Sequence, residues 1–224
     1  MRKLLVVLIV LGVLAVGGDR LAAGLVASEA ERRLAAEGFT DPSVQLKGFP
    51  FLTQLAGRDF SRVAVTGQRL EADEGSARDV DAELTDVRVP STGPVRIGSL
   101  SARGTVPYDV VVEAAGAGSL RLEPGTAGQV RVSRTVEALG QTFDVVAQAR
   151  VQARGSRLRL VPTGLEVEGG GSLDDQLSAL LADRVAVTYP IPDLPDGVQV
   201  EQITAGPDGF VVQVSGRDVS VNRP

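Results

Sequence analysis

The chain has 224 residues and a formal net charge of −5, and it contains neither cysteine nor histidine. Disulfide bonds, zinc–thiolate sites, histidine-ligated metals and histidine-dependent catalysis are therefore excluded. The negative charge disfavours nucleic-acid binding, which needs a basic face against phosphate. Hydrophobic residues make up 43% of the chain but aromatic residues only 4%, so Val, Leu and Ala must build most of any core or cavity.

The N-terminus has the pattern of an export signal. Arg2 and Lys3 precede an uncharged apolar run from Leu4 to Val16. This run matches the apolar part of a signal peptide and is short for a membrane span, which needs about 20 apolar residues. Because the helical pattern continues past it, residues 1–18 fit a cleaved signal peptide and an uncleaved signal anchor alike. Either form predicts that residues 19–224 are exported as a single domain; a cytosolic protein with a buried N-terminal helix is the remaining alternative.

Residues 19–37 have the pattern of an amphipathic helix. Gly38 supplies a C-cap, and Asp41-Pro42 ends the helix. The apolar residues recur four apart, as Leu21 and Leu25 and, beside them, Val26, Ala30 and Leu34. A stripe this narrow fits against a sheet or on a membrane surface, and we favour packing on a sheet.

The segment from Val44 to Gly57 is the most unusual part of the chain, because two of the six phenylalanines flank a proline there. Pro50 has no amide hydrogen and a fixed φ, so it fits badly inside a sheet. We predict a short turn that presents a hydrophobic tongue, formed by Phe49, Phe51, Leu52 and Leu55. By spacing alone, these side chains fit a plug at the end of a core as well as an exposed surface.

After the tongue, apolar and polar residues alternate, which is typical of β-strands. The alternation slips at 84–87 and again at 97–100, which predicts bulges or bends. The clearest strand spans 143–153, and Gly155-Ser156 turns the chain into its hairpin partner. A last strand pair surrounds Pro207-Asp208-Gly209, a strong turn signal.

Two segments interrupt the strands. Residues 107–115 fit a short helix that begins at a proline, although their valine run fits a strand as well. Residues 172–181 predict a helix more clearly, because Ser172 and Asp175 form a capping box ahead of three leucines on one side. With no internal repeat or linker, the pattern predicts one mostly β domain of α+β class, a strongly bent antiparallel sheet with helices against its apolar face.

The sequence of the tongue resembles a family signature. Gly48-Phe49-Pro50-Phe51-Leu52-Thr53-Gln54-Leu55, followed by Gly57, resembles the Gly-x-Pro-Phe-Leu-x-Gln pattern of the LmeA-like family of actinobacterial exported proteins. Residues 190–198 and the strand from Phe210 to Val221 resemble the ending of that family, and Asp19-Arg20 resembles its beginning. The resemblance covers nearly the whole chain.

The resemblance implies a fold and a function. The fold would be similar to that of the tubular lipid-binding (BPI-like) proteins, a strongly curved antiparallel sheet wrapped on a long helix. The function would be that of a phospholipid-binding or lipid-transfer protein of the cell envelope, on the extracytoplasmic (periplasmic) side of the plasma membrane. The family supplies no catalytic residue to transfer to this chain.

A lipid site follows from this resemblance and the strand pattern together. The apolar face of 143–153 carries small side chains that would leave a groove for the acyl chains of a phospholipid or another lipid. We predict that this groove is lined by Phe143, Val145, Ala147 and Ala149, with Phe49, Phe51, Leu52 and Leu55 at its mouth. No cofactor is expected, and the N-terminal segment would associate with the membrane. A filled core without a cavity remains the alternative.

Two other functions stay open at this stage. The chain would suit a scaffolding protein of the envelope, whose exposed apolar patch binds an unknown protein partner. An enzyme is the weaker alternative, since a glycosidase needs two carboxyl groups about 5–9.5 Å apart. Its candidate carboxylates, Asp109, Glu113 and Asp174, lie where turns and helix caps are expected.

Overall fold

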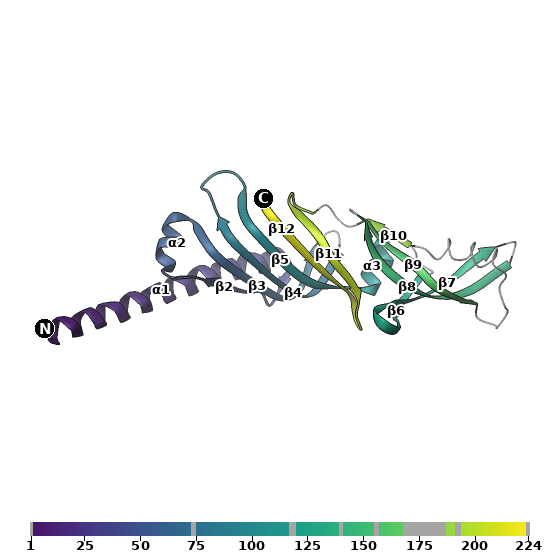
Figure 1. Cartoon of the computed structure of the whole chain (residues 1–224), viewed down its shortest axis with the longest axis horizontal. Coiled ribbons are helices and arrows are strands. Elements are labelled where there is room, and N and C mark those ends of the chain that lie inside the picture. The colour runs from purple at the N-terminus through teal and green to yellow at the C-terminus, as the bar shows by residue number, and fades with distance from the viewer. Residues whose placement is uncertain are drawn as a thin grey trace.

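In the computed structural model, the chain forms two antiparallel sheets, three α-helices and one short 3-10 helix within the described residues (Figure 1). The described residues are 2–72, 75–116, 120–138, 141–154, 157–167, 187–190 and 194–222. The molecule is elongated, with the larger sheet nearer the N-terminus and the smaller sheet at the far end (Figure 1).

The larger sheet has seven strands in the order β1-β3-β4-β5-β12-β11, and β2 also pairs with β3. Its strands are β1 (Phe39–Thr40), β2 (Ser43–Lys47), β3 (Asp59–Ala72), β4 (Gly75–Arg88), β5 (Val95–Pro107), β11 (Val198–Ala205) and β12 (Gly209–Val221). The predicted final strand pair is therefore present as β11 and β12, which meet across Ala205 and Phe210.

The predicted slips in alternation have a backbone cause. Asp86, Gly98 and Asp218 lie beside one another on β4, β5 and β12, between residue pairs that keep their register. Asp86 and Asp218 have φ angles of 52° and 51°, in the left-handed region that Asp tolerates better than most residues. A Cβ atom at position 98 would lie 2.9 Å from the Cβ of Asp86, so glycine suits this crossing point.

The smaller sheet has five strands in the order β10-β9-β8-β7-β6. They are β6 (Leu120–Pro124), β7 (Val130–Ala138), β8 (Gln141–Arg154), β9 (Arg157–Val167) and β10 (Val187–Pro190), and the 3-10 helix η1 (Thr126–Gly128) joins β6 to β7. The predicted strand 143–153 lies within β8, and its predicted hairpin partner is β9.

The three helices are α1 (Arg2–Ala36), α2 (Phe51–Gly57) and α3 (Tyr108–Ala114). The predicted helix at 19–37 is thus the second half of α1. Of the two structures that residues 107–115 fitted, the helix is the one present, as α3. The expected packing of Leu21 and Leu25 is wrong, because both are 73% exposed. The side of α1 that turns inward instead includes Asp19 and Ala23, both buried.

The expectation of one strongly bent sheet is also wrong, because the chain builds two sheets and neither is strongly curled. After β5, the chain leaves the larger sheet through α3, forms the smaller sheet and returns as β11 and β12. Alternation identifies strands but not their partners, so it could not show this division. The expected likeness to the tubular lipid-binding proteins depended on a strongly curved sheet around a long helix.

The predicted helix at 172–181 lies outside the described residues.

Two apolar clusters fill the interior. The larger one lies where α3, the smaller sheet and β12 meet, and its buried members are Val111, Leu120, Leu122, Val130, Val132, Val145, Ala147, Ala149, Leu160 and Phe210. Tyr108 packs edge-on against Phe210, with ring centroids 5.0 Å apart, and its hydroxyl donates a 2.6 Å hydrogen bond to the Gly206 carbonyl. The smaller cluster, at the α2 end of the larger sheet, contains only Val87, Ile97 and Val219 as fully buried residues.

Candidate functional site

The tongue folds as helix α2, and local sequence explains why it is so short. Pro50 occupies the N-cap position, after a cis Phe49–Pro50 peptide bond, where the missing amide hydrogen of proline costs little. Arg58 ends the helix in the left-handed conformation, with φ of 53° and its amide donating to the Leu55 carbonyl. The chain then enters β3 at Asp59.

The four tongue residues do not share one environment. Phe51 is only 1% exposed, and its ring centroid lies 6.1 Å from that of Phe60 on β3. By contrast, Phe49, Leu52 and Leu55 are 59%, 49% and 37% exposed. Phe51 therefore plugs the end of the core, and the idea that it faces solvent is wrong. Phe49, Leu52 and Leu55 form an exposed apolar surface, which we call the α2 patch.

A buried carboxylate joins α2 to α1. Asp19 is 2% exposed, and its Oδ1 accepts a 2.8 Å hydrogen bond from the backbone N–H of Leu52. The first N–H groups of a helix have no partner within the helix, and negative charge is favourable there. Among the described residues, Oδ2 of Asp19 has no hydrogen-bond partner. Asp19 thus caps α2 from another helix and fixes the α2 patch beside the point where the apolar run 4–16 ends.

A second set of bonds fixes α2 to the larger sheet. The Gln54 side-chain oxygen accepts a 2.9 Å hydrogen bond from the Ser61 N–H, and the Ser61 hydroxyl donates to the Lys47 carbonyl at 3.1 Å. Gly48 closes this corner with φ of 115°, and a Cβ atom there would lie 2.5 Å from the Ser61 hydroxyl oxygen. Gly48 and Gln54 are therefore structural, since both are needed to bring α2 against β3.

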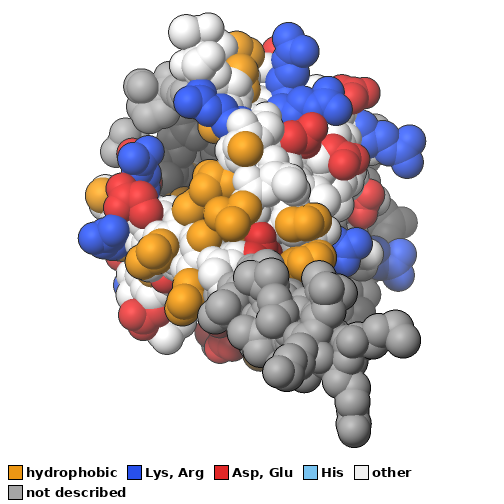
Figure 2. Space-filling model, turned by 90° about the vertical axis from the view of Figure 1, so that its left-hand side faces the viewer, with side chains coloured by type: hydrophobic (Ala, Val, Ile, Leu, Met, Phe, Trp, Pro, Cys, Tyr) orange, Lys and Arg blue, Asp and Glu red, His pale blue; other side chains and the backbone are white. Residues whose placement is uncertain are grey.

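The α2 patch belongs to the half of the molecule that contains the larger sheet. In the described part of the chain, the large hydrophobic side chains that are exposed lie in α1, in α2 or just before it, in the segment before β11, or at the end of β12; they are Leu21, Leu25, Phe49, Leu52, Leu55, Leu194 and Val221. The described residues of the smaller sheet contribute none. Viewed from the N-terminal end, apolar side chains gather beside the emerging N-terminal helix, with charged side chains around them (Figure 2).

A family model matches most of the chain, including the α2 end. The model of the LmeA-like phospholipid-binding family matches residues 17–215. The chain belongs to this family. The LmeA-like family is lipid-binding and not catalytic, and membership implies phospholipid binding. No curated protein and no solved structure matches the chain significantly.

In this LmeA-like protein, each position of the Gly-x-Pro-Phe-Leu-x-Gln motif has a structural task. Gly48 allows the close corner, Pro50 starts α2, Phe51 fills the core and Gln54 binds β3. Leu52 combines a buried backbone bond to Asp19 with an exposed side chain. The sequence identified the motif, but the role of Asp19 as a remote cap was missed, because the partners are 33 residues apart.

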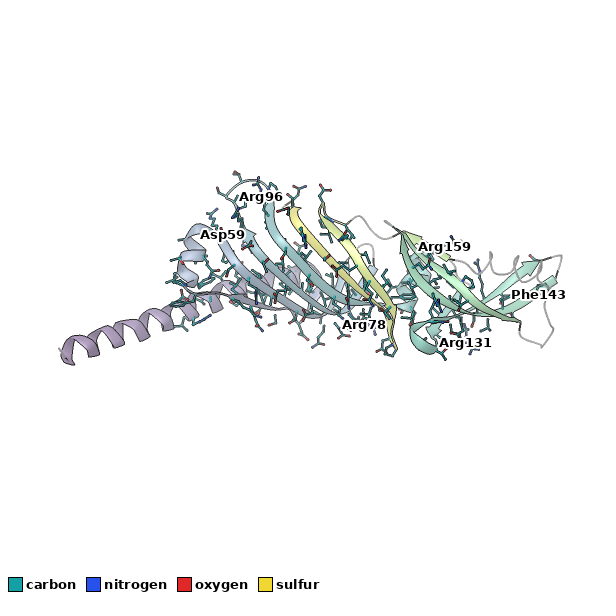
Figure 3. All side chains as sticks on the ribbon, in the orientation of Figure 1. Asp59, Arg78, Arg96, Arg131, Phe143 and Arg159 are labelled. Carbon is teal, nitrogen blue, oxygen red and sulfur yellow. The ribbon has the colours of Figure 1, made fainter. Side chains whose placement is uncertain are left out.

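The other predicted groove residues lie elsewhere. Val145, Ala147 and Ala149 are fully buried in the larger cluster, and Phe143 packs at its margin. Figure 3 shows Phe143 at the opposite end of the molecule from Asp59, which adjoins α2. The structure therefore does not bring the predicted groove and its predicted mouth together. Lipid contact by Phe143, Val145, Ala147 and Ala149 stays a prediction, and it would require the cluster to open.

A different apolar surface leads away from the α2 end. One row of residues is paired across β3, β4, β5, β12 and β11, and all of its members are apolar and half-buried: Val65, Ala82, Ala102, Val214 and Val200. This apolar row lies on the same face as Val63 and Leu84, which pack against the smaller cluster near Phe60. The periodicity of single strands contained this signal, but only strand pairing aligns the five residues.

Two of the three candidate carboxylates lie on one short helix. Asp109 and Glu113 are exposed on α3, and Asp109 Oδ1 accepts a hydrogen bond from the neighbouring Val110 N–H. Asp174 lies outside the described residues. Across the described part of the chain, no group of three or more acidic side chains is placed to hold a metal ion. Nor does any helix, within those same ranges, combine the length and apolar character of a membrane span.

Proposed function

We propose that the protein is an exported, membrane-associated phospholipid-binding protein of the cell envelope, which takes up lipid at its α2 end. Family membership supplies the ligand class. The proposal adds the direction of approach, with the α2 patch toward the bilayer and the two sheets extending away from it. It also places the protein on the extracytoplasmic side, on the strength of the basic and apolar N-terminus.

The observation that carries this proposal is the exposed α2 patch beside the exit of α1. Helix α1 is continuous from Arg2 to Ala36, and the Asp19–Leu52 hydrogen bond holds α2 against it. If residues 4–16 lie in lipid, this bond places the α2 patch at the lipid surface. Complete burial of a Leu or Phe side chain contributes roughly 1.5–3 kcal/mol relative to water, so three such side chains suffice for appreciable membrane affinity.

The apolar row supports a path for the acyl chains. It continues the face on which Phe51 and Phe60 pack, so a chain that enters beside α2 meets apolar side chains along the larger sheet. Burying an acyl chain contributes about 0.8 kcal/mol for each methylene group. An acyl chain laid on half-buried side chains needs no opening of the packed larger cluster.

Phospholipid binding is tested on the full chain purified from membranes. Native mass spectrometry should detect co-purifying phospholipid, and vesicles should load lipid onto protein that has been stripped of it. Leu52→Asp should abolish most of this loading, because a charge among acyl chains costs several kcal/mol. Gln152→Asp is the matched control, since it adds the same charge at an exposed position of the smaller sheet.

Each outcome of this experiment decides between the two leading functions. Loss of lipid loading in Leu52→Asp alone supports uptake at the α2 end. A protein that stays lipid-free with every vesicle contradicts the proposal and favours the scaffolding alternative, in which the α2 patch binds another protein. Mass spectrometry of the mature N-terminus settles whether residues 1–18 are cleaved or remain as an anchor.

A further inference from the structure

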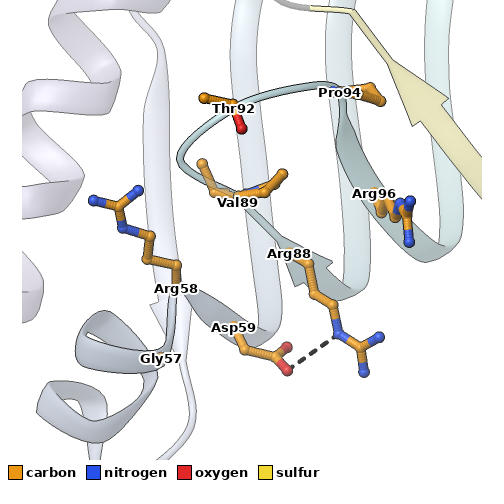
Figure 4. Close-up of a pocket in the computed structure, with 9 residues that line it drawn as sticks. Gly57, Arg58, Asp59, Arg88, Val89, Thr92, Pro94 and Arg96 are labelled. Carbon is orange, nitrogen blue, oxygen red and sulfur yellow. Dashed lines mark hydrogen bonds and ion pairs between the residues drawn. The ribbon is translucent and has the colours of Figure 1, made fainter.

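Two cationic hollows flank the tongue. One hollow, of about 380 Å³, adjoins the C-terminal end of α2, and its charged side chains are Arg58, Asp59, Arg88 and Arg96 (Figure 4). The other, of about 420 Å³, lies between α1 and β2 at the Gly48 end of the tongue. Arg20 and Lys47 are its charged residues. The α2 patch therefore has basic side chains before and after it.

The arginines of the first hollow have an excess of positive charge. Arg88 and Arg96 are direct partners across β4 and β5, a placement in which like charges repel. Arg88 also pairs with Asp59, with 3.2 Å between Nε and Oδ2, but both side chains are at least half exposed. Within the described residues, Arg58 and Arg96 have no ion-pair partner. One carboxylate thus serves three guanidinium groups.

The arrangement of these arginines suits a surface rather than a single small anion. In Figure 4, Arg58 projects from one side of the loop at 89–94, whereas Arg88 and Arg96 project from the other. The three groups therefore point in different directions and do not converge on one point (Figure 4). Guanidinium groups bind phosphate through paired N–H donors, and a lipid bilayer presents many phosphates in one plane.

We propose that the α2 end docks selectively on an anionic phospholipid surface, with lipid phosphates on Arg58, Arg88 and Arg96 and the α2 patch inserted between them. This inference rests on the proposed function and adds the class of headgroup. The whole chain carries a net charge of −5, so an anionic membrane repels most orientations of the molecule. Local cations beside the α2 patch favour the orientation in which the α2 end faces the bilayer.

The expected effect follows from the number of cations removed. Each basic residue near an anionic bilayer strengthens docking about 5-fold. Arg58→Gln together with Arg96→Gln should therefore weaken docking roughly 25-fold on anionic vesicles. This pair leaves the Arg88–Asp59 ion pair intact. Arg131→Gln with Arg159→Gln is the matched control, because both side chains are exposed on the smaller sheet, far from α2 (Figure 3).

The experiment uses the full chain reconstituted in vesicles. Because the protein has no cysteine, Ala56→Cys on the exposed side of α2 accepts a single fluorophore. Nitroxide-labelled lipids then report the fraction of molecules with α2 at the bilayer. The vesicles are phosphatidylcholine alone or phosphatidylcholine mixed with phosphatidylglycerol. Inorganic phosphate and chloride are compared at equal ionic strength.

The inference expects strong quenching on the mixed vesicles, weak quenching on phosphatidylcholine, and loss of the difference only in the Arg58/Arg96 variant. Equal displacement by phosphate and chloride supports a surface-charge interaction, whereas selective displacement by phosphate shows a free-anion site and overturns the inference. Equal quenching on both vesicles also overturns it, while the proposed function stands. Absence of quenching on every vesicle contradicts the proposed function itself.

Discussion

The two ends of the molecule use their apolar residues in opposite ways. At the junction of α3 with the smaller sheet, ten side chains are buried against one another. They come from β6, β7, β8 and β9 of the smaller sheet, from α3, and from β12 of the larger sheet. At the α2 end, only three residues are fully buried in the cluster, and Phe49, Leu52 and Leu55 face outward. Folding favours the first arrangement. The second therefore indicates a surface kept apolar for a partner.

The comparison also separates two phenylalanines that the sequence presents as equivalent. Phe49 and Phe51 flank Pro50, yet one is exposed and the other is buried against Phe60. The helical turn that begins at Phe51 directs its side chain inward, while Phe49, two residues earlier, stays outside the helix. Substitutions at the two ends of the molecule should therefore separate stability from lipid binding.

The largest effect on stability is expected at the junction. Phe210→Ala should lower the free energy of unfolding by about 3–5 kcal/mol, because it leaves a cavity beside Tyr108 and the smaller sheet. Phe49→Ala should change it by less than about 0.5 kcal/mol, as is usual for exposed positions. Urea denaturation followed by circular dichroism measures both. Similar losses in the two variants would remove the contrast between the ends.

Phe51→Asp should be the next most damaging change. It places a carboxylate where a buried ring contacts Phe60, and detaching α2 limits the cost to roughly 2–4 kcal/mol. Phe49→Asp should melt like the wild type and yet lose phospholipid loading. Thermal melting and lipid loading on the same preparations compare the two. A Phe51→Asp protein with wild-type melting and no lipid uptake would instead place Phe51 at a lipid entrance.

A smaller effect is expected where α1 meets α2. Asp19→Ala removes the acceptor of the Leu52 N–H bond and should destabilise the attachment of α2 by about 1 kcal/mol. Hydrogen exchange at the Leu52 amide should then be about 5-fold faster. Asp19→Asn keeps an acceptor oxygen and serves as the control. Unchanged protection in Asp19→Ala would show that Gln54 and Phe51 hold α2 without Asp19.

The smallest effect concerns pH at the junction. Burial raises the pKa of Tyr108 above its ordinary value, and the nearby Asp208 carboxylate raises it further. Because the folded-state pKa is the higher one, the contribution of the neutral hydroxyl is complete below about pH 10, the pKa in unfolded chains. It is lost as pH rises through the folded-state pKa.

Tyr108→Phe should therefore flatten the decline in the free energy of unfolding above about pH 10. At neutral pH it should cost about 1 kcal/mol, through the lost hydrogen bond to the Gly206 carbonyl. Urea denaturation at neutral and alkaline pH measures both effects. An identical alkaline decline in wild type and variant would assign it to other groups.

Local sequence was sufficient for several elements. Alternation located β8 and its partner β9 because each strand has one buried face, and the slips at 84–87 and 97–100 marked the positive φ of Asp86 and the close approach at Gly98. The turn at 207–209 connects β11 and β12 as predicted. These features depend on residues that are neighbours in the chain.

The candidate site was predictable only in part. The tongue motif gave the family and the short helix at Phe51–Gly57, but not which of its apolar side chains face outward. The groove assigned to β8 had the right pattern for an apolar face, and the structure fills that face with packed side chains. Arg88 and Arg96 are eight residues apart and read as isolated surface charges until strand pairing brings them together.

The sequence by itself determined the family, the strand periods and the N-terminal export pattern, because each depends on local composition and spacing. Only the tertiary structure decided that the strands divide into two sheets, that Leu21 and Leu25 face outward, and that Asp19 caps α2. Those outcomes depend on contacts between distant segments, whose free energies no local pattern records. The position of the α2 patch between two cationic hollows also depends on such contacts, since α1, β2, β4 and β5 must assemble before the two hollows exist.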